Sequence, residues 1–387
     1  MRTFGKWLIR IVVMLVLAAV VVGFWQREQI TRLLAVNSLF SEEKIVSNFS
    51  NMDAAFLNSP VSRGNGPTAE LLYGADAALP PQVADWTTAR DVTALVVLKD
   101  GEIVHESYYK GTAPEDLRIS WSVAKSYLSA LVGVLLEDGT IGLIDDPVVQ
   151  YAPTLKGGAY DGATIRNVLN MASGVTFDED YLDQSSDINR MGRVLALGGS
   201  MDDFASGLTE TFAPAGEGWK YVSIDTHILS MVVREATARP IAELLSEKVV
   251  APMGLEREPY YLTDGFGTAF VLGGLNLTTR DYARMGQMFL QNGEYNGRQI
   301  VPADWVAAST APSAPTAEGE IGYGYQWWIP KAAIAGEFMA RGIYGQYVYV
   351  NRARGVVIAT NAADRKFRDE GVADENVAIF RAIADGI

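Results

Sequence analysis

The pattern in this sequence with the clearest chemical potential is Ser-x-x-Lys, which occurs at Ser122 and Lys125. Residues i and i+3 share one face of a helix, so a lysine amine can accept the serine proton and make the hydroxyl a nucleophile. Two further copies begin at Ser41 and Ser107. Ser41 lies in a charged segment, and Ser107 lies in a predicted strand, where i and i+3 point to opposite faces. Context therefore favours Ser122.

The chain after Ser122 is strongly apolar over residues 122–136, SVAKSYLSALVGVLL. A lysine in such a helix is at least partly buried, and desolvation lowers its pKa toward that of a usable base. The spacing alone also fits a simple N-cap serine followed by a surface lysine. The choice between the two needs the surrounding sequence.

Composition narrows the possible chemistry. The 387 residues carry a net charge of −14, no cysteine and two histidines. An acidic body repels phosphate backbones, so nucleic-acid binding is not expected. The absence of cysteine excludes disulfides, thiolate metal sites and cysteine nucleophiles. His105 and His227 are expected to be structural, and neither a metal nor another cofactor is expected.

The predicted elements place strands at the two ends of the body and helices between them. Two strand-like runs at 93–98 and 102–109 flank an Asp-Gly turn. Helices are predicted at 122–136, 164–171, 224–236 and 279–290, followed by strands at 323–328, 338–350 and 355–360 and a helix at 370–384. This order predicts an α+β fold in which N- and C-terminal strands form one antiparallel sheet that carries a large, mostly helical insertion.

The N-terminal sequence is typical of a membrane segment. An apolar run at residues 11–25 follows Arg2, Lys6 and Arg10, which is typical of a signal anchor or signal peptide. We expect an anchor at residues 1–26, a linker and wrapping arm at 27–85, and a catalytic domain at 86–387. The positive-inside rule then predicts a bacterial inner-membrane protein whose body faces the periplasm, or a secreted protein if the segment is cleaved. A buried N-terminal core helix is the alternative.

Five blocks occur in one order: residues 120–133, 137–148, 163–175, 273–286 and 323–328. Together they resemble the β-lactamase-related serine hydrolases of the class C type, which include penicillin-binding proteins, carboxylesterases and 6-aminohexanoate-dimer hydrolases. The resemblance covers about residues 90–385. It implies a β-lactamase/transpeptidase-like fold and a nucleophile at Ser122 with Lys125 beside it.

The family's second motif, Tyr-x-Asn or Tyr-x-Ser, matches Tyr221 and Ser223. The resemblance implies that Tyr221 is a general base or proton shuttle and that Ser223 hydrogen-bonds the substrate. A second literal match, Tyr349 with Asn351, lies in a late strand and is rejected.

The family's third motif is Lys-Thr-Gly, which this chain lacks. The matching stretch is assigned to Ile343, Tyr344 and Gly345, with the backbone amides of Ser122 and Gln346 as the implied oxyanion hole. The lost lysine removes a partner for the carboxylate of a β-lactam or a peptidyl-D-alanine. The resemblance therefore favours the esterase and amidase branches.

Further pocket residues are suggested by position. Tyr181 stands where 6-aminohexanoate-dimer-hydrolase-like sequences carry a substrate-facing tyrosine. The acidic cluster around it (Asp178, Glu179, Asp180 and Asp183) is expected to solvate a loop. Three tryptophans could line the cleft or pack in the core: Trp121, Trp327 and Trp328.

The sequence thus predicts a hydrolase that cleaves amide or ester bonds of small substrates through an acyl-enzyme on Ser122. Two alternatives stay open. One is a penicillin-binding-like D-Ala carboxypeptidase or weak β-lactamase. The other is a non-catalytic relative that binds cell wall.

Overall fold

A seven-stranded antiparallel sheet organises the body in the computed structural model, which describes residues 2–387. Its strand order is β3-β2-β13-β12-β11-β10-β9. The N-terminal hairpin therefore pairs with the C-terminal strands, and the α+β prediction is confirmed. The strands are β2 (Val92–Lys99), β3 (Glu102–Tyr108), β9 (Gly322–Tyr323), β10 (Trp328–Ile329), β11 (Glu337–Gly342), β12 (Gln346–Asn351) and β13 (Val356–Ala362).

Both faces of this sheet are buried, which explains its continuous apolar runs. On β2, Val96 and Leu98 enter one hydrophobic core, and Leu95 and Val97 enter the other. Helix α13 (Thr279–Leu290) covers the first face across β2, β12 and β13. Helices α4 (Gln82–Ala89) and α15 (Val372–Gly386) contribute to the second core.

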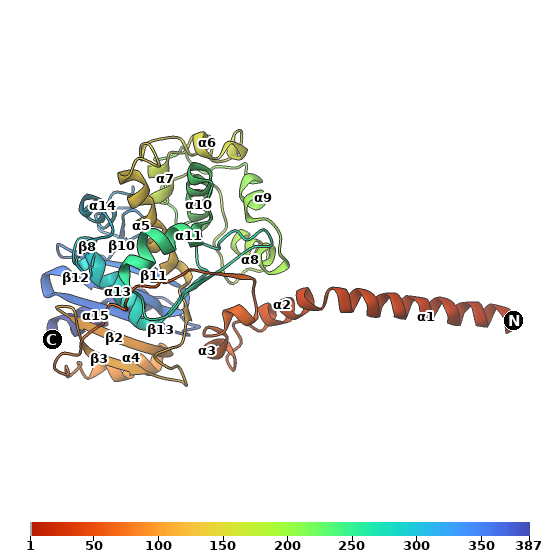
Figure 1. The fold of residues 1–387 in the computed structure, drawn as a ribbon, viewed down its shortest axis with the longest axis horizontal. Helices are drawn as coiled ribbons and strands as arrows, with labels where there is room; N and C mark the ends of the chain where they lie inside the picture. The colour runs from red at the N-terminus through yellow and green to blue at the C-terminus, as the bar shows by residue number, and fades with distance from the viewer. Residues whose placement is uncertain (1) are drawn as a thin grey trace.

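The helical insertion lies above the sheet in Figure 1. Its longer helices are α5 (Ala124–Glu137), α8 (Asp187–Leu197) and α10 (Ile224–Thr237). The remaining helices are α6 (Val148–Tyr151), α7 (Ile165–Leu169), α9 (Met201–Ser206), α11 (Ile241–Leu245), α12 (Ala251–Met253) and α14 (Ala303–Ser309). Smaller sheets combine β1 (Asn58–Pro60), β5 (Tyr260–Leu262), β6 (Leu275–Leu277) and β4 (Arg118–Ile119), and pair β7 (Glu294–Tyr295) with β8 (Arg298–Gln299).

Two predicted strands prove to be broken. The run 338–350 is a hairpin of β11 and β12, and the run 323–328 is split between β9 and β10. Tyr344 and Gly345 adopt φ values of 60° and 87° in the first turn, and Gln326 adopts 65° in the second. An apolar run does not reveal a turn when buried residues flank it on both sides.

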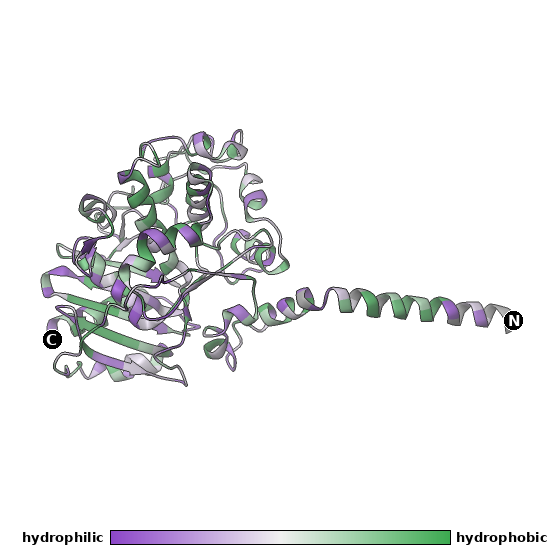
Figure 2. Cartoon of the chain, in the orientation of Figure 1, coloured by the Kyte–Doolittle hydropathy of each residue, from purple (hydrophilic) through white to green (hydrophobic). Residues whose placement is uncertain are grey.

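The N-terminal helix α1 (Arg2–Trp25) projects away from the body (Figure 1). Its segment Gly5–Trp25 is long and apolar enough to cross a membrane. Figure 2 shows hydrophobic residues along most of this helix, and large side chains such as Leu15 and Val21 are exposed. After it come α2 (Arg27–Asn37), which contacts α8, and α3 (Ile45–Asn48).

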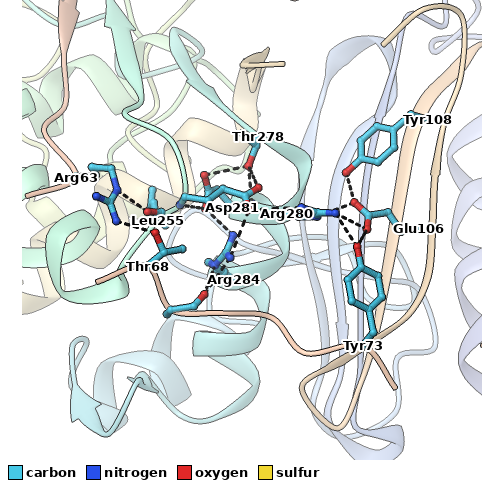
Figure 3. A network of polar contacts seen from close by, with 12 residues as sticks. Arg63, Thr68, Tyr73, Glu106, Tyr108, Leu255, Thr278, Arg280, Asp281 and Arg284 are labelled. Carbon is cyan, nitrogen blue, oxygen red and sulfur yellow. Dashed lines mark hydrogen bonds and ion pairs between the residues drawn. The ribbon is translucent and has the colours of Figure 1, made fainter. Parts of the chain in front are cut away.

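The extended arm after β1 is fastened to the body by a polar network (Figure 3). Arg280 of α13 donates to Glu106 of β3 at 2.7 and 2.8 Å. Tyr73 of the arm donates to Glu106 at 2.6 Å and accepts from Arg280 at 2.7 Å. Arg63 and Arg284 extend this network to backbone carbonyls. The arm therefore packs against the sheet and α13.

Candidate active site

Ser122 and Lys125 meet at the start of α5. A 3-10 turn over Trp121–Val123 leads directly into the helix, so the two side chains share one face. Lys125 Nζ lies 3.0 Å from Ser122 Oγ. Its other contacts are the Leu272 carbonyl oxygen at 2.7 Å and Ser223 Oγ at 3.2 Å. A neutral amine in this position can accept the hydroxyl proton of Ser122.

Burial prepares Lys125 for that role. Its side chain is 1% exposed. The loss of water around the ammonium lowers the pKa of Lys125 to about 7, while the negative charge of Glu179 partly opposes that shift. A large fraction of this lysine is therefore neutral near neutral pH, which suits a general base.

Tyr221 stands beside this pair. Its ring centroid is 5.3 Å from Lys125 Nζ, and the ring stacks on Trp328 at 5.0 Å. Burial and the charge of Glu179 raise the pKa of Tyr221 above that of an ordinary phenol, although Ser122 and Arg341 act in the opposite direction. The phenol is thus protonated at neutral pH and able to donate a proton.

Ser223 links Lys125 to a carboxylate that the sequence analysis assigned to solvent. The backbone N–H of Ser223 donates to Glu179 at 2.9 Å, and its hydroxyl donates to the same side chain. Tyr181 also donates to Glu179. The expectation that the whole acidic cluster solvates a loop is therefore wrong for Glu179. Its only signal in the sequence is its place two residues before Tyr181.

A pocket of about 440 Å³ opens above the nucleophile. Its lining combines catalytic candidates, aromatic side chains and charged groups. The lining residues are Ser122, Glu179, Tyr181, Tyr221, Trp328, Arg341, Gly342, Ile343, Tyr347, Phe367, Arg368, Asp369, Gly371, Ala373 and Asp374.

Comparison with known proteins assigns this arrangement to a family. Residues 85–381 match the family model described as Beta-lactamase. The chain belongs to the beta-lactamase family. It is 32% identical over 279 residues to a 6-aminohexanoate-dimer hydrolase from Paenarthrobacter ureafaciens, an alignment that covers 68% of this chain and 71% of the relative.

Solved structures share this fold. A putative 6-aminohexanoate-dimer hydrolase from Bacillus anthracis superposes with a TM-score of 0.78 at 24% identity, covering 89% of this chain and 95% of the other. EstCE1, a hydrolase with promiscuous acyltransferase activity, gives a TM-score of 0.61 at 15% identity over 78% and 96%. Together with the sequence relative, these matches make the protein an amide or ester hydrolase of the serine type.

Of the segment that the sequence assigned to the third motif and the oxyanion hole, only the first residue lines the pocket. Ile343 lines the pocket, but Tyr344, Gly345 and Gln346 are not among its lining residues. Tyr344 stacks on Phe40 at 5.0 Å. The Gln346 side chain donates to three backbone carbonyls, those of Ile343, Tyr344 and Ala362.

The strand segment beside the nucleophile is instead the end of β11. A β-carbon added to Gly342 would lie 2.7 Å from the Ser120 carbonyl oxygen and 3.1 Å from the Ser122 nitrogen. Strand β10 pairs with β11 only at Trp328 and Met339. Past Met339, β11 therefore presents a free edge to the pocket.

Most of the other residues singled out from the sequence do not line this pocket. His105 contacts Ser107 at 2.8 Å on β3, and buried His227 contacts Asp202 at 2.8 Å. Tyr349 is buried in β12. Of the three tryptophans, only Trp328 lines the pocket. Within residues 2–387, no group of three or more His, Asp or Glu side chains is arranged to hold a metal.

Proposed function

We propose that this member of the beta-lactamase family cleaves small amide or ester substrates through an acyl-enzyme on Ser122. The observation that supports this most strongly is the 3.0 Å contact between Lys125 Nζ and the Oγ of Ser122, a residue that lines a pocket. A buried lysine with a lowered pKa can remove the hydroxyl proton as Oγ attacks the substrate carbonyl.

The leaving group must then receive a proton before it can depart. In our proposal Lys125 takes the proton from Ser122, and Tyr221 gives its phenolic proton to the departing nitrogen or oxygen and is reprotonated from Lys125. Water later attacks the acyl-enzyme along the reverse relay and releases the acid. The raised pKa of Tyr221 supports a proton donor and relay rather than a resting phenolate.

Backbone amides would hold the developing oxyanion. The amide of Ser122 is one donor, at the start of a helical segment where amides have no intrahelical partner. For the second donor we propose Ile343 in place of Gln346. Ile343 follows the free end of β11 and lines the pocket, whereas Gln346 does not.

Labelling with a fluorophosphonate probe tests the nucleophile. We expect wild-type protein to be labelled and Ser122→Ala to be unlabelled. Ser107→Ala is the matched control, because it removes the serine of another Ser-x-x-Lys copy and should leave labelling intact. Persistent labelling of Ser122→Ala would refute the assignment.

Intact-mass spectrometry then tests the substrate class. Short p-nitrophenyl esters and 6-aminohexanoate dimers should be turned over, in keeping with the relative named above. Rapid, stable acylation by benzylpenicillin would favour a penicillin-binding-like enzyme. Muropeptide binding that survives Ser122→Ala, without any turnover, would favour a non-catalytic relative.

We further propose that α1 anchors the enzyme in the bacterial inner membrane with its body in the periplasm. The apolar segment Gly5–Trp25 supports a span, and Lys6 and Arg10 lie at its N-terminal end. Protease added to spheroplasts should digest the body of the full-length protein while it remains in the membrane fraction. Protection of the body would contradict this orientation.

A further inference from the structure

We propose that Phe40 and Phe49 position the two backbone amides of the proposed oxyanion hole. Both side chains come from the segment between α2 and β1 (residues 38–57), which precedes the residues 85–381 that match the family model. The inference rests on the proposed function and adds two positioning residues to it. It predicts that this N-terminal segment is needed for the chemistry as well as for the fold.

Each proposed oxyanion donor has a neighbour with a left-handed backbone. Trp121, directly before Ser122, has a φ of 43°, and Tyr344, directly after Ile343, has a φ of 60°. Bulky residues rarely adopt this region, because the β-carbon comes too close to the backbone. Such a conformation persists only where contacts from the surrounding structure hold it. The contacts of Trp121 and Tyr344 therefore determine where the two amides point.

Phe40 and Phe49 supply such contacts to both residues. The ring of Phe40 stacks on Tyr344 at a centroid distance of 5.0 Å and an interplanar angle of 12°, and it lies 5.8 Å from the ring of Trp121. The ring of Phe49 meets Trp121 and Tyr344 edge to face, at 5.5 Å in each case. The four rings thus form one aromatic cluster, in which two rings from the N-terminal segment bridge the two strained residues.

Backbone contacts also tie Phe49 to the chain that leads into the nucleophile. The carbonyl oxygen of Phe49 accepts from the N–H of Ile119 at 3.0 Å. Ile119 ends β4, which pairs with β6. Arg118 of the same strand is buried and donates to the carbonyl oxygen of Val46 at 2.7 Å. A shift of the N-terminal segment would therefore move β4, which ends three residues before Ser122.

Glycines confine the backbone of the nucleophile from other directions. A β-carbon added to Gly273 would lie 3.5 Å from Trp121 Cα, and one added to Gly342 would lie 3.1 Å from the Ser122 nitrogen. A glycine has no side chain that could hold the ring of Trp121. Among the described residues, the aromatic contacts of that ring are Phe40, Phe49 and Tyr344. The N-terminal segment therefore provides two of the three.

Phe49→Leu tests this inference against a matched change elsewhere. Phe289→Leu is the control, because Phe289 of α13 is equally buried and contacts Trp327 and Phe338, which do not line the pocket. We expect Phe49→Leu to lower kcat roughly 10- to 100-fold with little change in KM, since a displaced amide weakens stabilisation of the transition state. Phe289→Leu should keep its kcat, although both variants should lower the Tm.

Phe40 provides a second test that does not disturb a fully buried site. Its side chain is 36% exposed, so Phe40→Ala should fold. We expect Phe40→Ala to lower kcat in the same way, and Phe40→Tyr, which keeps the ring, to restore it. Affinity for a boronic acid, which forms a tetrahedral adduct with the serine, should fall by the same factor as kcat/KM. The acidic limb of the pH profile should stay in place, because Lys125 is unchanged.

Three results would overturn the inference. The first is an equal loss of kcat in Phe49→Leu and Phe289→Leu, which would indicate a general effect of core packing. The second is a normal kcat in Phe40→Ala, and the third is a rise in KM alone. Failure of the proposed function would differ from all three, because hydrolysis would then persist in Ser122→Ala.

Discussion

Glu179 accepts hydrogen bonds from both the backbone N–H and the hydroxyl of Ser223. Ser223 Oγ in turn lies 3.2 Å from Lys125 Nζ. Glu179 therefore holds in place a hydroxyl group that contacts the proposed base. Glu179 also favours the charged form of Lys125 and thereby raises its pKa.

We expect Glu179→Gln to shift the acidic limb of kcat/KM to lower pH. Asp180→Asn, which changes the half-buried neighbouring acid, should leave that limb in place, and an unmoved limb in Glu179→Gln would contradict this role.

The wild-type pH profile should report Lys125 itself. Burial lowers its pKa to about 7, and the neutral amine is the proposed base. The value of kcat/KM should therefore rise about tenfold per pH unit below pH 7 and level off above it. Lys125→Met should remove this limb and lower the rate on the order of 10²- to 10⁴-fold. A limb that persists in Lys125→Met would assign the titration to another group.

Tyr221→Phe should separate substrates by their leaving groups. An amine needs a proton to depart, whereas p-nitrophenolate does not. We expect a loss on the order of 10²-fold or more for an amide and a much smaller loss for a p-nitrophenyl ester, measured as kcat. Tyr323→Phe removes a hydroxyl from a ring that contacts Tyr221 at 6.2 Å and serves as the control. Equal losses on both substrates would argue against proton donation by Tyr221.

Gly342→Ala should lower kcat through a steric clash alone. The φ of Gly342 is −122°, which any residue adopts, but its new β-carbon would press on the backbone of Ser120 and Ser122. We expect a large fall in kcat with a folded protein by circular dichroism. Gly192→Ala in α8, where nothing lies within 4 Å of the added carbon, should retain full activity. Normal kcat in Gly342→Ala would mean that the nucleophile tolerates displacement.

Asp225 should make stability fall as pH rises. It is fully buried, it accepts hydrogen bonds from Tyr160 and Ser173 at one oxygen, and its other oxygen has no partner among the described residues. Burial raises the pKa of Asp225 from 3.8 to about 7. Ionisation therefore destabilises the folded state progressively between about pH 4 and 7.

Asp225→Asn should remove that dependence. We expect it to stabilise the protein by as much as about 3 kcal/mol at pH 8, and by much less near pH 4. Thermal unfolding at the two pH values measures the difference. Asp161→Asn, a change at an exposed acid, controls for the loss of one charge. An equal shift at both pH values would show that titration of Asp225 is not responsible.

Several elements could be predicted because their signals are local. The Asp-Gly turn with its flanking apolar runs is observed as the hairpin of β2 and β3. The helix predicted at 279–290 is observed as α13 over the same residues. The end of β11 was not placed in this way, because buried apolar residues flank the turn on both sides and make the run 338–350 resemble one strand. That turn moved the pocket-lining segment to Arg341–Ile343.

The amino-acid sequence was enough to predict that Ser122 and Lys125 share one helical face, since their three-residue spacing falls in an apolar run that is typical of a buried helix. It did not bring Glu179 to Ser223 or turn Arg341 into the pocket. Glu179 and Ser223 lie 44 residues apart in the sequence, and Arg341 lines the same pocket as Ser122 although 219 positions separate them. Only the packing of the insertion against the sheet decides which charged side chains lose contact with water.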